Sequence, residues 1–173
     1  VPFCTVKCGY CDFYSVAETG IATRRRRRVV DACVYQLEWF LSRIRPREVV
    51  SVYIGGGTPS VLGPAALASL VRRVLDAAGG CPTEVTVEVN PETTSAELVD
   101  FAWRAGVTRL SMGVQSFNAS TLEAMGRACS PDDTRRGAQI ATERWPGALN
   151  VDLMVGVPSQ RVEDSLRDVS EVL

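Results

Sequence analysis

Four short apolar segments alternate with helix-like patterns along the 173-residue chain, and this alternation constrains the fold more than any other feature. The segments are rich in β-branched side chains and span residues 49–57, 83–90, 109–116 and 149–156. Such runs predict buried strands. Because a helical pattern separates each strand from the next, we expect parallel βαβ units in an α/β domain.

Between the strands, apolar residues recur three or four positions apart, as is typical of amphipathic helices. These positions are Val30, Cys33, Leu37, Phe40 and Ile44, then Leu67, Leu70, Val74 and Ala78, and finally Val162, Leu166, Val169 and Leu173. We expect Leu166, Val169 and Leu173 to face the sheet. The five arginines at residues 24–28 could form a phosphate patch, but we interpret them as the solvated start of a helix.

Local signals mark helix ends. Thr94 and Glu97 have the spacing of a capping box, and Gly106 stands where that helix should end. Ser130 followed by Pro131 predicts another helix start.

Polar or glycine-rich residues stand near the ends of the predicted strands. They include residues 55–58, Glu88, Asn90, Gln115 and Ser116, while Asp152 lies within the fourth strand. Parallel α/β folds place their chemistry at the carboxyl ends of the strands. A barrel or half-barrel would therefore bring these residues together in one mouth.

The composition is that of an ordinary globular protein, with 46% hydrophobic and 23% charged residues. A net charge of −1 gives no reason to expect a nucleic-acid partner, and no apolar run approaches the ~20 residues of a transmembrane segment. The chain opens without the pattern of a secretory signal, so we expect a cytoplasmic protein, in which disulfides are rare. The absence of histidine excludes His-based acid–base catalysis and His-containing zinc sites within this chain.

Half of the six cysteines lie within eight residues, at Cys4, Cys8 and Cys11. Two structural interpretations are open: disulfides, or a zinc site whose fourth ligand is Cys33, Cys81 or Cys129. The functional interpretation is an iron–sulfur cluster, whose irons take thiolate ligands. Three thiolates on a four-iron cluster leave one iron open to a chelating ligand. We favour the cluster and expect the three scattered cysteines not to be ligands.

The spacing Cys4-x3-Cys8-x2-Cys11, with Tyr10 before the last cysteine, resembles the motif of the radical S-adenosylmethionine superfamily. The segments PFCTVKCGYCDF, YIGGGTPS, EVNPE, RLSMGVQSFN, MGR and NVDLMVGVPSQ follow in order. Together they resemble the family of oxygen-independent coproporphyrinogen III oxidases and the related heme chaperones. The resemblance implies a parallel partial (βα)6 TIM-like barrel. We expect residues 1–173 to be this radical SAM core domain, incomplete, without its first strand, last strand or C-terminal domain.

The resemblance also implies a role for each motif residue. Cys4, Cys8 and Cys11 would bind a [4Fe-4S] cluster, whose open iron S-adenosylmethionine would chelate. The implied contacts of that cofactor are Tyr10 near the adenine, Gly56, Gly57 and Thr58 at the methionine amine, Glu88, Gln115 and Asp152 around the ribose and amine, and Arg127 at the carboxylate. An electron from the reduced cluster would cleave the cofactor to methionine and a hydrogen-abstracting 5′-deoxyadenosyl radical.

Each of these assignments has a structural alternative. The glycines would otherwise form a tight turn, Tyr10 would be a packed aromatic residue, and Arg127 would be one surface arginine among many. Glu88, Gln115 and Asp152 would be surface or capping residues. We expect Glu88 and Asp152 to be buried instead, because they stand inside apolar strands, where an unpaired charge is costly.

Two positions depart from the family pattern. The oxidases have a further cysteine one residue after the triad, where this chain has Phe13, and the family often has a histidine where this chain has Cys129. Phe13 favours the heme chaperone over the oxidase. The implied partners are heme or porphyrinogen, an electron donor to the cluster and, for a chaperone, a heme-accepting protein. No residue is assigned to catalysis, and a non-catalytic zinc-binding or disulfide-stapled α/β domain is the alternative of another class.

Overall fold

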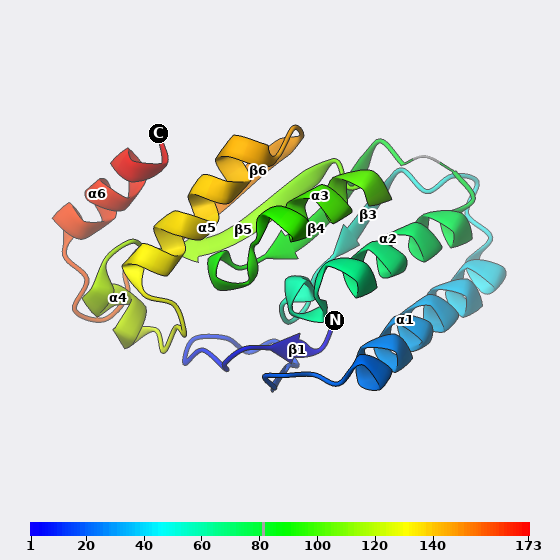
Figure 1. The fold of residues 1–173 in the computed structure, drawn as a ribbon, viewed down its shortest axis with the longest axis horizontal. Coiled ribbons are helices and arrows are strands. Elements are labelled where there is room, and N and C mark those ends of the chain that lie inside the picture. The colour runs from blue at the N-terminus through cyan, green and yellow to red at the C-terminus, as the bar shows by residue number, and fades with distance from the viewer. Residues whose placement is uncertain (81) are drawn as a thin grey trace.

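The computed structural model describes residues 1–80 and 82–173, and a four-stranded parallel sheet lies at its centre (Figure 1). The strands are β3 (Ser51–Ile54), β4 (Glu84–Val89), β5 (Arg109–Gln115) and β6 (Ala148–Leu153). They pair in chain order and every pair is parallel. The α/β prediction and the four predicted strands are thus confirmed, and the open sheet corresponds to part of a barrel.

A row of helices lies on one side of this sheet (Figure 1). They are α1 (Thr23–Ile44), α2 (Pro64–Ala78), α3 (Ala96–Ala105) and α5 (Pro131–Arg144). Each contacts the next along the row. The 3-10 turns η1 (Pro59–Leu62) and η2 (Pro91–Thr93) follow β3 and β4, and the short helix α4 (Ala119–Ala124) follows β5. None of the described helices is both long enough and apolar enough to span a membrane.

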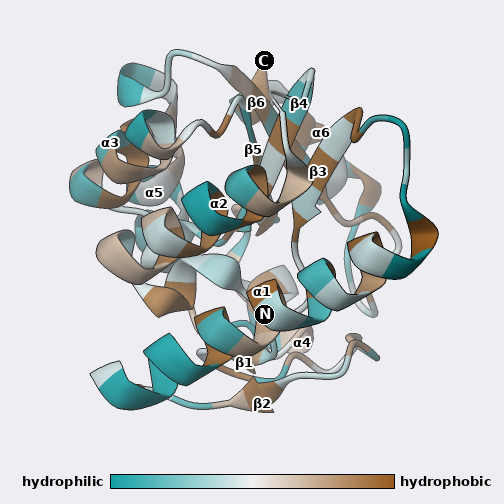
Figure 2. Cartoon of the chain, turned by 90° about the vertical axis from the view of Figure 1, so that its right-hand side faces the viewer, coloured by the Kyte–Doolittle hydropathy of each residue, from teal (hydrophilic) through white to brown (hydrophobic). Residues whose placement is uncertain are grey.

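The two faces of the sheet differ in chemistry. Side chains alternate along a strand, so Val85, Val87 and Val89 of β4 point toward the helices and are buried. The alternate positions of the strands are largely polar and include Tyr53, Glu88, Ser111 and Asp152. This alternation appears as bands of brown and teal along the strands in Figure 2. The strands were predicted as buried runs, and only one of their faces forms the core.

Helix starts agree with the sequence in two places and differ in one. The arginine run begins α1, and Ser130 caps α5, where its hydroxyl accepts a hydrogen bond from the Asp133 amide at 3.1 Å. The prediction that Thr94 caps α3 is wrong, because the capping residue is the next one, Ser95. Ser95 accepts the bond from the Leu98 amide, whereas the buried Thr94 donates its hydroxyl to the Asn90 carbonyl at 2.8 Å. Gly106 ends α3, as predicted.

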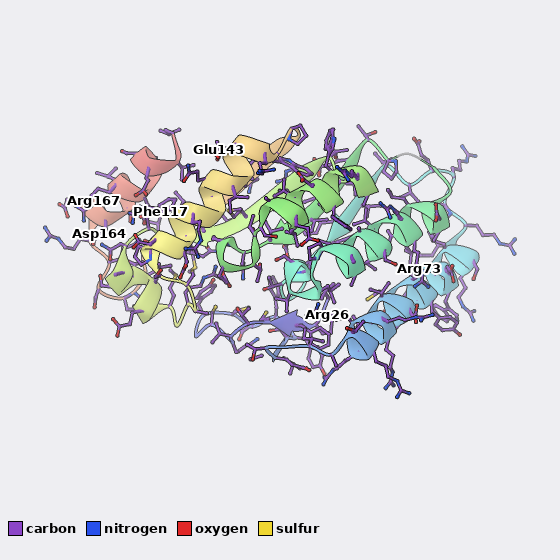
Figure 3. The ribbon with its side chains drawn as sticks, in the orientation of Figure 1. Arg26, Arg73, Phe117, Glu143, Asp164 and Arg167 are labelled. Atoms are coloured by element: carbon purple, nitrogen blue, oxygen red, sulfur yellow. The ribbon has the colours of Figure 1, made fainter. Side chains whose placement is uncertain are left out.

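Helix α6 (Val162–Val172) packs in the opposite sense from the prediction. Leu166, Val169 and Leu173 are exposed, and the helix buries Asp164 and Asp168 instead. Figure 3 shows Asp164 and Arg167 on α6, at the same end of the molecule as Phe117. The carboxylate of Asp168 accepts hydrogen bonds from the Ser116 hydroxyl at 2.6 Å and the Phe117 amide at 2.8 Å. Polar bonds to the loop after β5 therefore hold this helix.

A small second sheet was not predicted. Strand β1 (Phe3–Cys4) pairs in parallel with β2 (Val16–Ala17), so that Phe3 lies opposite Val16 and Cys4 opposite Ala17. The intervening residues 5–15, which we call the cysteine loop, contain Cys8 and Cys11 and are closed at their base by this pairing.

Candidate functional site

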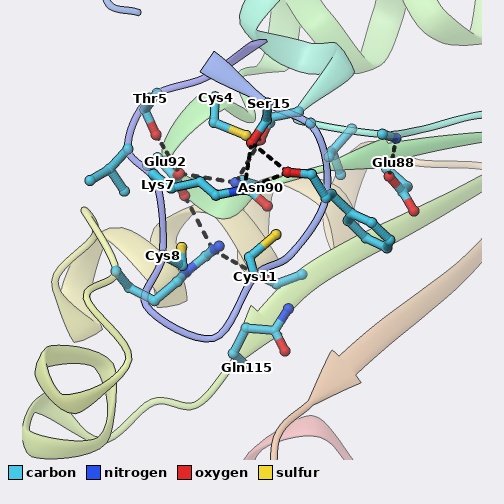
Figure 4. Close-up of a pocket in the computed structure, with 18 of the residues that line it drawn as sticks. Cys4, Thr5, Lys7, Cys8, Cys11, Ser15, Glu88, Asn90, Glu92 and Gln115 are labelled. Carbon is cyan, nitrogen blue, oxygen red and sulfur yellow. Dashed lines mark hydrogen bonds and ion pairs between the residues drawn. The ribbon is translucent and has the colours of Figure 1, made fainter. Parts of the chain in front are cut away.

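A pocket of about 190 Å³ opens beside the cysteine loop, at the carboxyl ends of the strands (Figure 4). It is lined by the cysteine loop, the turn after β3, the ends of β4 to β6 and the segment after α4. The eleven site residues named from the sequence all line it: Cys4, Cys8, Tyr10, Cys11, Gly56, Gly57, Thr58, Glu88, Gln115, Arg127 and Asp152. Residues from six motifs, spread over about 150 positions of sequence, thus share one cavity.

The cysteine loop is held in place by backbone bonds. The Cys11 amide donates to the Cys8 carbonyl at 3.2 Å, and the Gly9 amide donates to the Met125 carbonyl at 3.0 Å. Cys4, Cys8 and Cys11 carry free thiols and are half-buried. The Thr58 hydroxyl lies 3.5 Å from the Cys4 sulfur, which links the first cysteine to the turn after β3.

The spacing of these thiols bears on the zinc alternative. Within residues 1–80 and 82–173, no three His, Cys, Asp or Glu side chains are placed to hold one metal ion together. A zinc ion needs its ligands converging on a single point. In a four-iron cluster each thiolate binds a different iron, so the sulfurs need not converge. Among these residues the three thiols therefore do not form the converging ligand set of a zinc site.

The remaining cysteines do not line this pocket, as far as the structure describes them. Cys33 packs against the main core. Cys129 is buried beside Leu122 and Met125, and its sulfur accepts a hydrogen bond from the Thr134 hydroxyl at 3.4 Å. The expectation for Cys81 lies outside the described residues.

The glycine turn after β3 is shaped by a close approach of the chain. Residues 1–3 run along it, because the Gly57 amide donates to the Val1 carbonyl at 2.7 Å and the Thr58 amide to the Phe3 carbonyl at 2.6 Å. A Cβ on Gly57 would lie 2.5 Å from the Phe3 carbonyl oxygen. Gly56 has φ 112°, which side chains rarely adopt. Both glycines are thus needed to seat the segment that carries Cys4.

Glu88 and Asp152 differ in burial. Glu88 is half-buried, and its carboxylate accepts hydrogen bonds from the Tyr53 hydroxyl at 2.7 Å and the Gly56 amide at 3.1 Å. Burial and the bond to this carboxylate raise the pKa of Tyr53 to about 12. The predicted burial of Asp152 is wrong. Its carboxylate is exposed on the open polar face of the sheet and accepts bonds from Ser111 at 3.2 Å and Asn150 at 2.7 Å.

Gln115 occupies a strained position at the end of β5. It has φ 68°, in the left-handed region, although it is not glycine. The pairing of β5 with β6 shifts its register between Gly113 and Gln115. Such an irregularity changes the direction in which a side chain points near the end of a strand. Here the side chain of Gln115 lines the pocket.

Arg127 reaches the pocket from the segment after α4. Its side chain is 5% exposed, and Nη2 donates to the Gly113 carbonyl at 2.8 Å and lies 3.6 Å from Glu92 Oε2. Burial is the largest single effect and lowers the pKa of Arg127, but the charges of Glu92, Cys129, Tyr10 and Cys8 together outweigh it and the pKa is raised. Nε is buried and has no hydrogen-bond partner among the described residues. A buried guanidinium with a free donor is suited to an incoming carboxylate.

Tyr10 and Phe13 form the aromatic part of the pocket. The pKa of Tyr10 is raised to about 12, chiefly by burial. The positive charge of Arg127 opposes this rise, and the nearby Cys8 and Cys11 add to it. Phe13 lines the pocket and is 64% exposed.

Some lining residues were not assigned from the sequence. Glu92 and Lys7 lie inside quoted motifs, and Asn90 was noted only as a strand end. Asn90 donates to the Thr58 hydroxyl and to Glu92, both at 3.2 Å, while the Lys7 ammonium donates to the Phe13 carbonyl and to Ser15. Their motif positions were the available signal. The bond from Asn90 to Thr58 joins two motifs and has no pattern along the chain, whereas the bonds to Glu92, Phe13 and Ser15 are local.

Comparison with curated proteins finds relatives that match the whole chain. The chain is 38% identical over 177 residues to the heme chaperone HemW of Escherichia coli, covering 100% of this chain and 46% of that protein. It is 35% identical to the mitochondrial radical S-adenosyl methionine domain-containing protein 1 of Bos taurus, covering 99% of this chain and 38% of that protein. The chain therefore spans less than half the length of these relatives.

Solved structures show the same fold. The coproporphyrinogen III oxidase HemN of Escherichia coli, described as a radical SAM enzyme, superposes with a TM-score of 0.83 at 25% identity. That match covers 99% of this chain and 39% of the oxidase. The family model of the radical SAM superfamily matches residues 1–169, which include the cysteine triad and every other residue around the pocket. Since the match extends over nearly the full sequence and the fold agrees with it, this chain belongs to the radical SAM superfamily.

Proposed function

We propose that this chain holds a [4Fe-4S] cluster on Cys4, Cys8 and Cys11 and binds S-adenosylmethionine beside it. The observation that carries the proposal is the meeting of three free thiols with the buried, partly unsatisfied guanidinium of Arg127 in one cavity. The thiols suit a cluster with one open iron, and Arg127 suits the carboxylate of its ligand. The superfamily match supports the same cofactors.

The chain's own residues would orient the bound cofactor. Arg127 would pair with the methionine carboxylate, and the backbone of Gly56 and Gly57 would border the amine. Glu88 is held by Tyr53 and the Gly56 amide, so its carboxylate is already oriented to accept bonds from the amine or ribose. When bound, the reduced cluster supplies an electron for cleavage of the sulfonium, and the protein excludes water from that chemistry.

We further propose that the full-length protein is a heme chaperone. The support comes from the 38% identity to the HemW chaperone and from Phe13, which lines the pocket at the position where the oxidases have another cysteine. Phenylalanine can neither ligate a metal nor relay a proton. The proposed partners are heme, a heme-accepting protein and an electron donor to the cluster.

The second candidate is an oxygen-independent coproporphyrinogen III oxidase. It is supported by the close superposition on HemN. Both candidates use the same cluster and cofactor, so binding of these two groups does not separate them.

Two experiments test the proposal in sequence. Anaerobic reconstitution with iron and sulfide should give a brown protein with about four irons per chain. A zinc site would load zinc and stay colourless, since zinc is a d¹⁰ ion.

The second experiment separates the chaperone from the oxidase. The full-length, reconstituted protein is incubated anaerobically with reductant, S-adenosylmethionine and coproporphyrinogen III, and heme binding is titrated in parallel. We expect heme binding and no formation of protoporphyrinogen above a cluster-free control. Turnover well above that control would assign the oxidase, and absence of both heme binding and turnover would contradict the chaperone.

A further inference from the structure

The Glu92 side chain joins three parts of the pocket that are far apart in sequence. It lies in η2, directly after β4, and is 14% exposed. Oε1 accepts hydrogen bonds from the Thr5 hydroxyl at 3.1 Å and from the side-chain Nδ2 of Asn90 at 3.2 Å, and Oε2 lies 3.6 Å from Arg127 Nη2 (Figure 4). One carboxylate thus contacts the cysteine loop, the end of β4 and the segment after α4.

The charge of Glu92 accounts for the burial of Arg127. A guanidinium that is removed from water without a counter-charge is costly, and it relaxes toward solvent if it can. Glu92 is the carboxylate paired with Arg127 among the described residues. Its charge is also the leading cause that raises the pKa of Arg127 against burial.

The Glu92–Arg127 pair leaves some of its hydrogen-bonding atoms without partners, and these atoms can bond a ligand. At 3.6 Å the two groups attract each other but do not form a hydrogen bond, and Glu92 Oε2 and Arg127 Nε are both buried without a hydrogen-bond partner among the described residues. Both residues line the pocket. The guanidinium is therefore held in position by Glu92 and the Gly113 carbonyl, with a donor still free.

We propose that Glu92 is a positioning residue that sets Arg127 to receive the carboxylate of an amino-acid-type ligand and ties it to the cysteine loop through Thr5. This inference rests on the proposed function, because the ligand is the methionine end of S-adenosylmethionine. Glu92 does not itself contact the reacting atoms. It acts through Arg127, and its loss should weaken cofactor binding more than it weakens cluster loading.

The test uses Glu92→Gln, which keeps an acceptor for Thr5 and Asn90 and removes the charge beside Arg127. Iron content and the Kd for S-adenosylmethionine are measured on anaerobically reconstituted protein by iron assay and calorimetry. We expect iron within the error of wild type and about tenfold weaker binding, the typical effect of losing one charged partner. The matched control is Glu84→Gln, since Glu84 also lies 3.6 Å from an arginine, Arg109, but outside the pocket.

A double-mutant cycle shows whether Glu92 acts through Arg127. The variant Glu92→Gln/Arg127→Gln should bind no more weakly than Arg127→Gln alone. Additive losses would contradict the positioning role, as would Glu92→Gln binding within twofold of wild type. Failure of the wild type to load iron or bind the cofactor would instead reject the proposed function, so the two failures are distinguishable.

A second variant covers the case in which Glu92→Gln does not fold, as judged by circular dichroism. Glu92→Asp keeps the charge and draws the carboxylate back by one methylene from Thr5 and Asn90. We expect binding weaker than wild type but stronger than that of Arg127→Gln. Wild-type affinity in Glu92→Asp would overturn the proposed geometry.

Discussion

At the scale of single residues, the cysteines of this chain lie in two kinds of surroundings. Cys4, Cys8 and Cys11 are half-buried and line the pocket, where a thiolate can reach a metal. Cys129 is buried among apolar side chains and behaves as a small core residue. The same side chain can thus be a ligand or a packing element, and its surroundings distinguish the two.

The first residue-scale prediction concerns iron. Cys8→Ala should lose nearly all reconstituted iron, because it removes one of three thiolates. Cys129→Ala should keep it, since this sulfur bonds Thr134 and does not line the pocket. Iron per chain after anaerobic reconstitution checks both. Equal loss of iron in the two variants would show that the three-ligand set is wrong.

The second residue-scale prediction concerns Gly57. Gly57→Ala places a methyl group against the Phe3 carbonyl, and forcing this overlap should lower the free energy of unfolding by about 1–3 kcal/mol. Urea unfolding measures the change. Gly80→Ala is the control, because a Cβ there meets no described atom within 4 Å, and its effect should stay within about 0.5 kcal/mol. A similar cost at both glycines would argue against the close approach.

The sequence predicts which side chains line the pocket, but it does not predict the hydrogen bonds and ion pairs that hold them there. Motif positions identified Cys4, Glu88 and Arg127, since each carries a recognisable chemical group in a family pattern. The links through Glu92 were not predictable, because they join residues 5, 92 and 127 across three motifs. The burial of Asp152 was inferred from its apolar neighbours in sequence, but its side chain points to the other face of the sheet.

At the scale of secondary-structure elements, α6 shows that a hydrophobic period does not by itself fix the buried face. Its apolar residues recur at helical spacing, yet Asp164 and Asp168 are the buried positions. Their carboxylates meet hydrogen-bond donors of the loop after β5, the loop that begins beside Gln115. Polar anchoring of this kind leaves the apolar stripe exposed.

This anchoring gives the element-scale prediction. Asp168→Ala leaves the Ser116 hydroxyl and the Phe117 amide without their acceptor, which should lower the free energy of unfolding by about 2–4 kcal/mol. Asp132→Ala is the control, because the one side-chain interaction of Asp132 among the described residues is an exposed ion pair with Arg135, and such pairs contribute ~0–1 kcal/mol. Thermal or urea unfolding compares the two. An Asp168→Ala protein as stable as the control would mean that α6 is held in another way.

Element boundaries were predictable where a single residue had the needed property. Gly106 ends α3 in the left-handed conformation, which few other residues adopt as easily. Thr94 and Ser95 can both cap a helix, so the sequence alone does not distinguish them. The choice depends on tertiary packing, because Thr94 is buried against Asn90 and its hydroxyl is already engaged.

At the scale of the whole molecule, helices α1, α2, α3 and α5 cover one face of the sheet and leave its polar face open (Figure 1). The cysteine loop lies across the carboxyl edge of this sheet, joined to η2 through Thr5 and to the segment after α4 through Gly9. A group bound by the three thiols would therefore cross-link Cys4, Cys8 and Cys11 within a segment that is held to the rest of the molecule by a few hydrogen bonds.

The whole-molecule prediction follows from this placement. Reconstitution of the cluster should raise the thermal midpoint of unfolding and protect the cysteine loop from proteolysis, because binding to the native state alone stabilises it. Removal of iron with a chelator should reverse both effects. A variant with Cys4, Cys8 and Cys11 all replaced by serine should show neither, and an equal rise in that variant would assign the stabilisation to non-specific iron.

The pairing of β1 with β2 also has an entropic consequence. A flexible loop loses conformational entropy when its side chains bind a cluster. This loss costs about 1–2 kcal/mol for each residue whose backbone becomes fixed. Here the ends of the loop are already joined at Phe3–Val16 and Cys4–Ala17, and the loop is also bound at its first residue, Thr5, and at Gly9. Much of that ordering is complete in the folded chain, so the affinity available from the iron–sulfur bonds goes into holding the cluster.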